Sequence, residues 1–192
     1  MKLKNSSNNK KGLFNFPVII YVIGTLVLLN GLLMLTCLPF AWIYDSSLNI
    51  HWYFILCSSI TLFTGGLMRW FTKEEKNAEI KKRDGYLIVV GGWLCMTLFG
   101  TLPYLVSESI PTFTNAFFET MSGYTTTGST ILNDIESLPR SILFWRSMTQ
   151  WIGGMGIIVL TIAILPLLGI GGMELFVAEA PGPTKDIIHP RI

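Results

Sequence analysis

A run of small hydroxyl residues around one glycine is the part of this sequence best suited to chemistry. Residues 125–130 read Thr-Thr-Thr-Gly-Ser-Thr, and apolar segments long enough to cross a bilayer lie on both sides. Their hydroxyl and carbonyl oxygens suit hard cations, because transition metals favour nitrogen and sulfur ligands. No Asp or Glu lies inside the run, which favours a monovalent cation over a tightly held divalent one. We therefore expect the function of the chain to reside in this turn.

The position of the turn among apolar segments requires a physical reason. Non-helical backbone at membrane depth persists only where it is buried in protein or lines a water-filled path. Carbonyl oxygens at such a place can replace the hydration shell of a cation. Gly128 can adopt backbone angles that residues with a Cβ resist, and we expect residues 125–129 to run extended with their carbonyls facing one axis. The alternatives are a plain connecting loop and a phosphate-binding loop, although the latter lacks its G-K-[ST] ending and its preceding strand.

A short apolar segment leads into the turn. As a helix, residues 112–122 would cover about 16 Å at ~1.5 Å per residue, half of a hydrocarbon core of ~30 Å. Pro111 suits a helix start, Thr112 and Thr114 are candidate caps, and Gly123 is a candidate stop. We expect the carbonyl end of this half-helix, with its partial negative charge of about 0.5, to point at the bilayer centre and favour a cation.

The composition indicates a polytopic membrane protein. The chain has 192 residues, of which 51% are hydrophobic and 14% charged, whereas a soluble domain is about one quarter charged. No basic stripe alternates with aromatic residues, so nucleic acid is not an expected partner. We predict an all-α fold with two leading transmembrane helices followed by one helix–re-entrant pore loop–helix repeat. The predicted spans are residues 17–44, 50–71, 86–106 and 141–168.

The distribution of Lys and Arg orients these spans, because cytoplasmic loops carry an excess of both. The amino-terminal tail (residues 1–16) and the linker (residues 73–85) are basic and are predicted to be cytoplasmic. The loop after the first span carries Asp45 and neither Lys nor Arg, so it faces outward. The leading helices then occupy residues 17–72, the repeat residues 86–168, and residues 169–192 form a cytoplasmic tail or linker.

We assign no chemical role to the other reactive residue types. The three cysteines, Cys37, Cys57 and Cys95, lie in apolar runs with no metal-ligand spacing, so we expect small hydrophobes against other helices. No nucleophile–base pair or metal cluster is apparent, so an enzyme is not expected. Five tryptophans fall near predicted interfaces, where belt anchoring accounts for them; these are Trp42, Trp52, Trp70, Trp145 and Trp151.

Four stretches of the sequence resemble the Trk/Ktr/HKT superfamily of potassium transporters, and most closely the bacterial TrkH-type uptake subunits. They are residues 117–123, 125–130, 144–160 and 179–185. The resemblance implies four helix–pore loop–helix repeats around one pore, with two extra helices before the first repeat. It implies that Thr126, Thr127 and Gly128 bind potassium through their carbonyls, with Thr125 and Ser129 as filter flanks. Gly153, Gly154 and Gly156, in the third stretch, favour close helix packing over a hinge.

The resemblance also pairs Arg146 with Glu119, although an interfacial arginine that snorkels to headgroups is an equal alternative. It implies potassium uptake in the bacterial inner membrane, with a cytoplasmic amino terminus and no cofactor beside the transported K⁺. The implied partners are the lipid bilayer, the remaining repeats, a second full subunit and a cytoplasmic nucleotide-binding regulatory subunit.

One repeat supplies one quarter of a filter, so we expect a fragment or one piece of a split protein. The alternatives are a pore of four identical copies and a non-conducting membrane scaffold or binding protein.

Overall fold

The computed structural model describes residues 14–45, 49–72 and 82–168. Every regular element within these ranges is a helix, which confirms the predicted all-α class. In chain order, the helices are α1 (Phe16–Leu35), α2 (Leu38–Tyr44), α3 (Ile50–Phe71), α4 (Lys82–Gly100), α5 (Leu102–Val106), α6 (Phe113–Tyr124) and α7 (Arg140–Leu168). Residues 1–13 of the predicted amino-terminal tail, residues 73–81 of the predicted linker and the carboxy-terminal tail lie outside the described residues. Residues 82–85, predicted as the end of the linker, form the first turn of α4.

Three stretches within the described ranges are long and apolar enough to cross a membrane: Phe16–Tyr44, Ile50–Phe71 and Arg83–Val106. They match the first three predicted spans within three residues at each end. Helix α7, with 29 residues, has the length of a span, about 44 Å at 1.5 Å per residue. Its bounds lie within one residue of the fourth predicted span.

Two of the predicted spans are each built from two helices. Helix α1 ends at Leu35, and α2 begins after a turn with Pro39 in its first helical turn. Helix α5 likewise carries Pro103 in its first turn, directly after α4. Proline fits there because its missing N–H would have no partner in the first turn of a helix. Each proline therefore restarts a helix near the end of a span.

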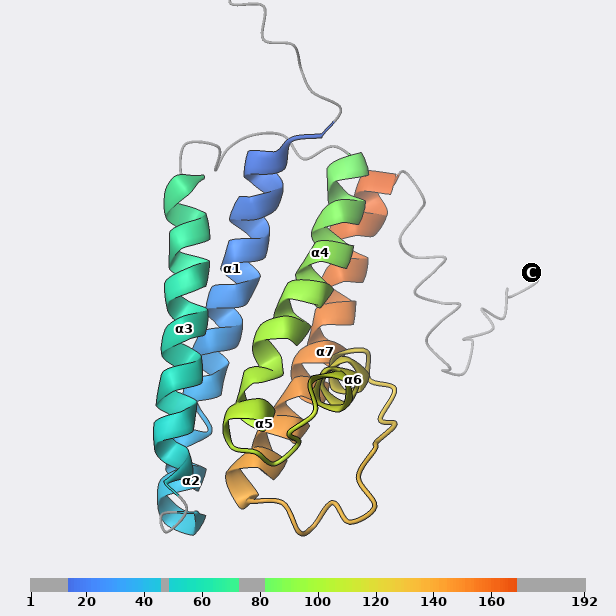
Figure 1. Cartoon of the computed structure of the whole chain (residues 1–192). Helices are drawn as coiled ribbons and strands as arrows, with labels where there is room; N and C mark the ends of the chain where they lie inside the picture. The colour runs from blue at the N-terminus through green and yellow to red at the C-terminus, as the bar shows by residue number, and fades with distance from the viewer. Residues whose placement is uncertain (1–13, 46–48, 73–81, 169–192) are drawn as a thin grey trace, which may run out of the picture.

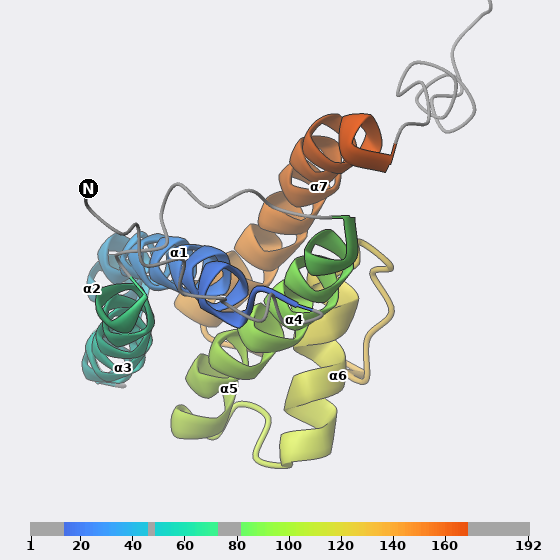
Figure 2. The same cartoon turned by 90° about the horizontal axis from the view of Figure 1, so that it is seen from above.

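The long helices run antiparallel in chain order (Figure 1). The beginnings of α1 and α4 lie at the same end of the molecule as the ends of α3 and α7. Helix α1 packs against both α3 and α4, while α6 packs against α4 and α7. Seen from above, α1, α2 and α3 form one group beside the group of α4, α5, α6 and α7 (Figure 2). The two leading helices therefore flank the unit that carries the threonine turn.

Close backbone contact joins α1 to α3. A Cβ added to Gly65 would lie 2.8 Å from the Leu28 nitrogen and 3.0 Å from the Gly24 carbonyl oxygen. Helices in membranes associate through such small residues, because lipid offers no hydrophobic drive for their contact. The pair Gly24 and Gly65 thus sets how closely the two leading helices approach.

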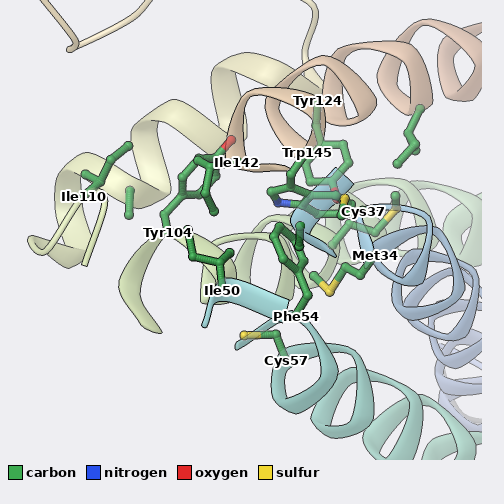
Figure 3. Packing of buried hydrophobic residues seen from close by; sticks show 14 residues of the cluster. Met34, Cys37, Ile50, Phe54, Cys57, Tyr104, Ile110, Tyr124, Ile142 and Trp145 are labelled. Carbon is green, nitrogen blue, oxygen red and sulfur yellow. The ribbon is translucent and has the colours of Figure 1, made fainter. Parts of the chain in front are cut away.

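The main core receives side chains from every helix from α1 to α7 (Figure 3). Trp145 is fully buried there, and its indole N–H donates to the Gly100 carbonyl at 2.9 Å. The prediction of an interfacial role for this tryptophan is therefore wrong, whereas the other four are exposed on the isolated chain. The three cysteines are free thiols at buried or half-buried positions, which confirms their packing role.

Candidate functional site

Helix α6 delivers the chain to the threonine turn. It begins after Pro111, with Thr112 at the capping position but without a hydrogen bond from the threonine side chain. It continues one residue past Gly123 and ends at Tyr124. Figure 1 views α6 nearly end-on and Figure 2 views it side-on, so it lies across the long helices. The carboxyl end of α6 meets α7, and the depth of α6 in a membrane stays a prediction.

The carboxyl end of α6 rests directly on α7. A Cβ on Gly123 would collide with the Thr149 hydroxyl oxygen, and one on Gly153 would collide with the Tyr124 carbonyl. Only glycine permits such an approach of two backbones. The interpretation of Gly153 as a packing residue agrees with this contact.

The turn itself bends more sharply than expected. Residues 125–129 were predicted to be extended, but Thr126 has φ 58° and Gly128 has φ 74°. The positive φ at Gly128 confirms the role assigned to that glycine. At Thr126 it is unusual, because a left-handed conformation costs a residue with a Cβ roughly 1–2 kcal/mol. Such strain persists only when the surrounding structure enforces it.

Hydrogen bonds from the turn to the end of α6 enforce this conformation. All four backbone N–H groups of residues 125–128 donate back to the last turn of the helix. The bonds run from Thr125 N to Met121 O (2.9 Å), from Thr126 N to Gly123 O (3.0 Å), and from Thr127 N and Gly128 N to Ser122 O (3.0 and 3.3 Å). The carbonyls of Met121, Ser122 and Gly123 at the helix end therefore accept the amides of the turn.

The carbonyls of the turn have the opposite arrangement. Within the described ranges, no hydrogen bond ends on the carbonyl oxygen of any of residues 125–128. The next carbonyl, that of Ser129, accepts from the Ser122 hydroxyl at 2.6 Å. Residues 125–129 are exposed on this chain. The turn thus directs its amides inward and leaves four carbonyl oxygens available to a ligand.

A buried carboxylate secures the far side of the turn. Glu119 accepts hydrogen bonds from the Thr130 hydroxyl (3.0 Å) and the Ile131 amide (3.1 Å) through Oε2. Its other oxygen, Oε1, forms an ion pair with Arg146 Nε at 2.6 Å. The Glu119 side chain is 1% exposed and that of Arg146 is 16% exposed. Of the two alternatives for Arg146, the structure shows the ion pair.

The start of α7 is capped by a residue from the leading helices. Asp45 follows α2 and accepts from the Arg140 amide (3.2 Å), the Ser141 amide (2.8 Å) and the Ser141 hydroxyl (2.6 Å). A carboxylate suits this position because the first helical N–H groups lack partners and carry a partial positive charge. In the sequence, Asp45 indicated only that the loop after the first span faces outward. No local signal links Asp45 to α7, because the two amides that donate to it lie 95 and 96 positions further along the chain.

A second tie from the leading helices reaches the end of α6. The Tyr124 hydroxyl donates to Asn30 Oδ1 at 2.6 Å, and Asn30 Nδ2 donates to the Met96 carbonyl at 3.3 Å. Asn30 and Tyr124 are both fully buried. Asn30 was not among the predicted site residues, although an amide inside an apolar run requires a hydrogen-bonding partner.

Comparison with known proteins places this arrangement in a family. The model of the TrkH family, described as "Cation transport protein", matches residues 52–192. The chain belongs to the TrkH family. It is 44% identical to the Trk system potassium uptake protein TrkH of Vibrio parahaemolyticus, over 92% of this chain and 36% of that protein. It is 46% identical to the Escherichia coli protein of the same name, over 93% of this chain and 37% of that protein.

A solved structure supports the fold of this TrkH-family chain. The crystal structure of the potassium transporter TrkH from Vibrio parahaemolyticus matches with a TM-score of 0.74 and 40% identity, over 86% of this chain and 35% of that chain. The chain spans a little over a third of the length of these relatives. Together with its apolar helices, the family makes it a multi-pass membrane protein, and a transport family is not an enzyme class.

The structure brings the predicted site residues together without testing their ligand. Thr125, Thr126, Thr127, Gly128 and Ser129 form one exposed turn, which Glu119 and Arg146 support from behind. Among residues 14–45, 49–72 and 82–168, no group of three His, Cys, Asp or Glu side chains could hold a metal. The assignment of potassium to Thr126, Thr127 and Gly128 stays a prediction.

Proposed function

We propose that this chain forms the amino-terminal part of a potassium uptake subunit and supplies one quarter of its selectivity filter. The observation that carries the proposal is the difference between the amides and the carbonyls of the turn. Its four amides are bound to α6, while residues 125–128 are exposed and their carbonyls accept no hydrogen bond within the described ranges. The relatives named as potassium uptake proteins support potassium as the transported ion.

The proposed mechanism is replacement of hydration water by backbone oxygens. A cation that enters the turn exchanges water for the carbonyls of Thr126, Thr127 and Gly128. The positive φ values at residues 126 and 128 change the direction of the chain between successive peptide planes. The hydroxyls of Thr125 and Thr127 lie 2.9 Å apart and supply further oxygens beside the turn. This helix–loop–helix unit, residues 82–168, acts as a re-entrant pore unit of the potassium-channel kind.

The remaining repeats of the same subunit are the proposed neighbours of the turn. The chain covers 36% of the length of its relative, and one turn cannot encircle an ion. Large apolar side chains on α6 and α7 are exposed near the turn, as expected of a surface that later repeats cover; these are Phe118, Trp151 and Met155. A second full subunit and a cytoplasmic nucleotide-binding subunit are further partners suggested by the family resemblance.

The proposed location is the bacterial inner membrane with the amino terminus in the cytoplasm. The end of the molecule where α1 and α4 begin also carries Arg69 and Arg83. The opposite end carries Asp45, the acidic loop with Asp134 and Glu136, and a single arginine, Arg140, at the start of α7. The excess of basic residues at the first end favours a cytoplasmic position for it.

The test is substitution of the turn glycine in the full-length subunit, meaning this chain joined to its downstream continuation. We expect Gly128→Arg to abolish potassium uptake with normal membrane abundance, because the change strains a positive φ and places a cation in the ion path. Gly85→Arg is the matched control, since a Cβ there meets no atom within 4 Å. Uptake that survives Gly128→Arg would contradict the proposal.

The alternative pore of four identical copies makes a different prediction. The exposed turn of a single chain is compatible with four copies placed around one axis. Cross-linked tetramers of this chain alone that conduct cations in bilayers would favour that alternative. Three further half-helix and glycine turns in the downstream reading frame would favour the single long subunit.

A further inference from the structure

We infer that Asn30, on the leading helix α1, is a positioning residue for the filter turn and acts through Tyr124. The inference rests on the proposed function of the turn and adds a determinant of its ion preference. Asn30 lies outside the segment that the family model matches, residues 52–192. The alignment of the filter turn would thus depend on α1, a helix that precedes the repeat.

The geometry ties α1 to the last residue before the turn. Tyr124 ends α6, and Thr125 begins the turn directly after it. The Tyr124 hydroxyl donates to Asn30 Oδ1 at 2.6 Å, across 94 positions of sequence. Asn30 in turn donates to the Met96 carbonyl on α4 at 3.3 Å. One buried amide therefore connects α1, α4 and α6 at the base of the turn.

The remaining surroundings of Tyr124 leave its ring little freedom. A Cβ added to Gly100 would lie 3.0 Å from both Tyr124 Cε2 and the hydroxyl oxygen, so the ring lies close against α4. The Trp93 ring centroid lies 6.2 Å away, and Gly153 of α7 meets the Tyr124 backbone. The hydrogen bond to Asn30 fixes the hydroxyl end of this enclosed ring. A shift of the ring would move the backbone that enters the turn.

The chemistry of Asn30 also argues for a specific role. A buried amide among apolar side chains costs free energy unless its oxygen and nitrogen are both paired. Asn30 is fully buried and pairs both groups, one with the tyrosine and one with a helix carbonyl. A leucine would fill this position in an apolar helix at no such cost. We assign the amide to alignment of Tyr124 because that is what its oxygen contacts.

The experiment compares four variants of the full-length subunit: Tyr124→Phe, Asn30→Leu, the combination of both, and Tyr21→Phe. Tyr124→Phe removes only the hydroxyl and keeps the enclosed ring. Tyr21→Phe is the matched control, because the Tyr21 hydroxyl accepts from Arg69 Nη2 at 3.0 Å and joins α1 to α3. The readouts are membrane abundance and the ratio of potassium to sodium uptake.

We expect Tyr124→Phe and Asn30→Leu each to lower the potassium-to-sodium ratio about fivefold, the population shift that one lost buried hydrogen bond produces. Tyr21→Phe should leave the ratio unchanged. The combined variant removes both polar partners, so it should regain abundance lost by either single change. Its potassium-to-sodium ratio should remain low, because the hydrogen bond between Tyr124 and Asn30 is still absent.

A purely structural role predicts the opposite pattern. A ratio that follows abundance, and that recovers in the combined variant, would overturn the inference. So would single variants whose ratio equals that of Tyr21→Phe. Failure of the proposed function is distinguishable, because it appears as potassium uptake that survives Gly128→Arg, whatever Asn30 does.

Discussion

Removal of the Glu119 carboxylate should release the far side of the threonine turn. The side chain makes an ion pair with Arg146 at 2.6 Å and accepts from Thr130 and Ile131. Breaking a buried ion pair costs about 3–5 kcal/mol, and the partial exposure of Arg146 favours the lower end. Glu119→Gln keeps an oxygen for the two donors, so we expect a local loss of about 3 kcal/mol. Glu119→Ala also leaves both donors without an acceptor, so we expect a local loss of about 5 kcal/mol.

Hydrogen exchange measures this loss at the affected backbone. The Ile131 amide is bonded to Glu119 Oε2, so its exchange reports directly on the contact. Each 1.4 kcal/mol changes an equilibrium constant about tenfold. Glu119→Gln should therefore speed hydrogen exchange through local opening about 100-fold in a peptide that covers residues 125–139. Glu136→Gln is the matched control, because it neutralises an exposed carboxylate in the same peptide. Equal exchange in both variants would refute the assigned role of the buried pair.

Two further predictions concern the supports of the turn. Asp45→Ala should weaken the start of α7 by about 1–2 kcal/mol, because the Ser141 amide and hydroxyl lose their acceptor; faster exchange at residues 140–143 checks this. Gly153→Ala should reduce uptake strongly, since its Cβ collides with the Tyr124 carbonyl, whereas Gly154→Ala makes only an ordinary 4.0 Å contact. Similar uptake by the two alanine variants would contradict the packing argument.

The membrane-spanning elements were predictable because hydropathy and helix length depend on local sequence. Residues 50–71 were predicted as a span, and α3 has those bounds. The division of the first span into α1 and α2 was not predicted. Proline at position 39 is compatible with a kink, a stop or a restart, and local sequence does not select among them. The restart depends on how α2 packs against α3 and α7.

The backbone conformation of the turn was predictable at Gly128 and not at Thr126. Gly128 has the positive φ that glycine favours, so its residue type was a direct signal. Thr126 has a positive φ against its own preference, because the bonds from the turn to Ser122 and Gly123 require it. Contacts between residues that are distant in the sequence could not be predicted either. The indole of Trp145 meets Gly100 from 45 positions away, so the position of this tryptophan near a span end gave a false signal of interfacial exposure.

The asymmetry of the turn argues against a plain connecting loop. A loop that only joins two helices has no need to hold a β-branched residue at positive φ, and strain of that kind is selected where it serves a site. Here the back of the turn is bonded to Ser122, and the residues that follow it are bonded to Glu119. The carbonyls of residues 125–128 accept no hydrogen bond within the described ranges. If the turn lies at membrane depth, as proposed above, carbonyls without a partner there are costly unless water or an ion meets them, and this favours a cation path over a plain loop.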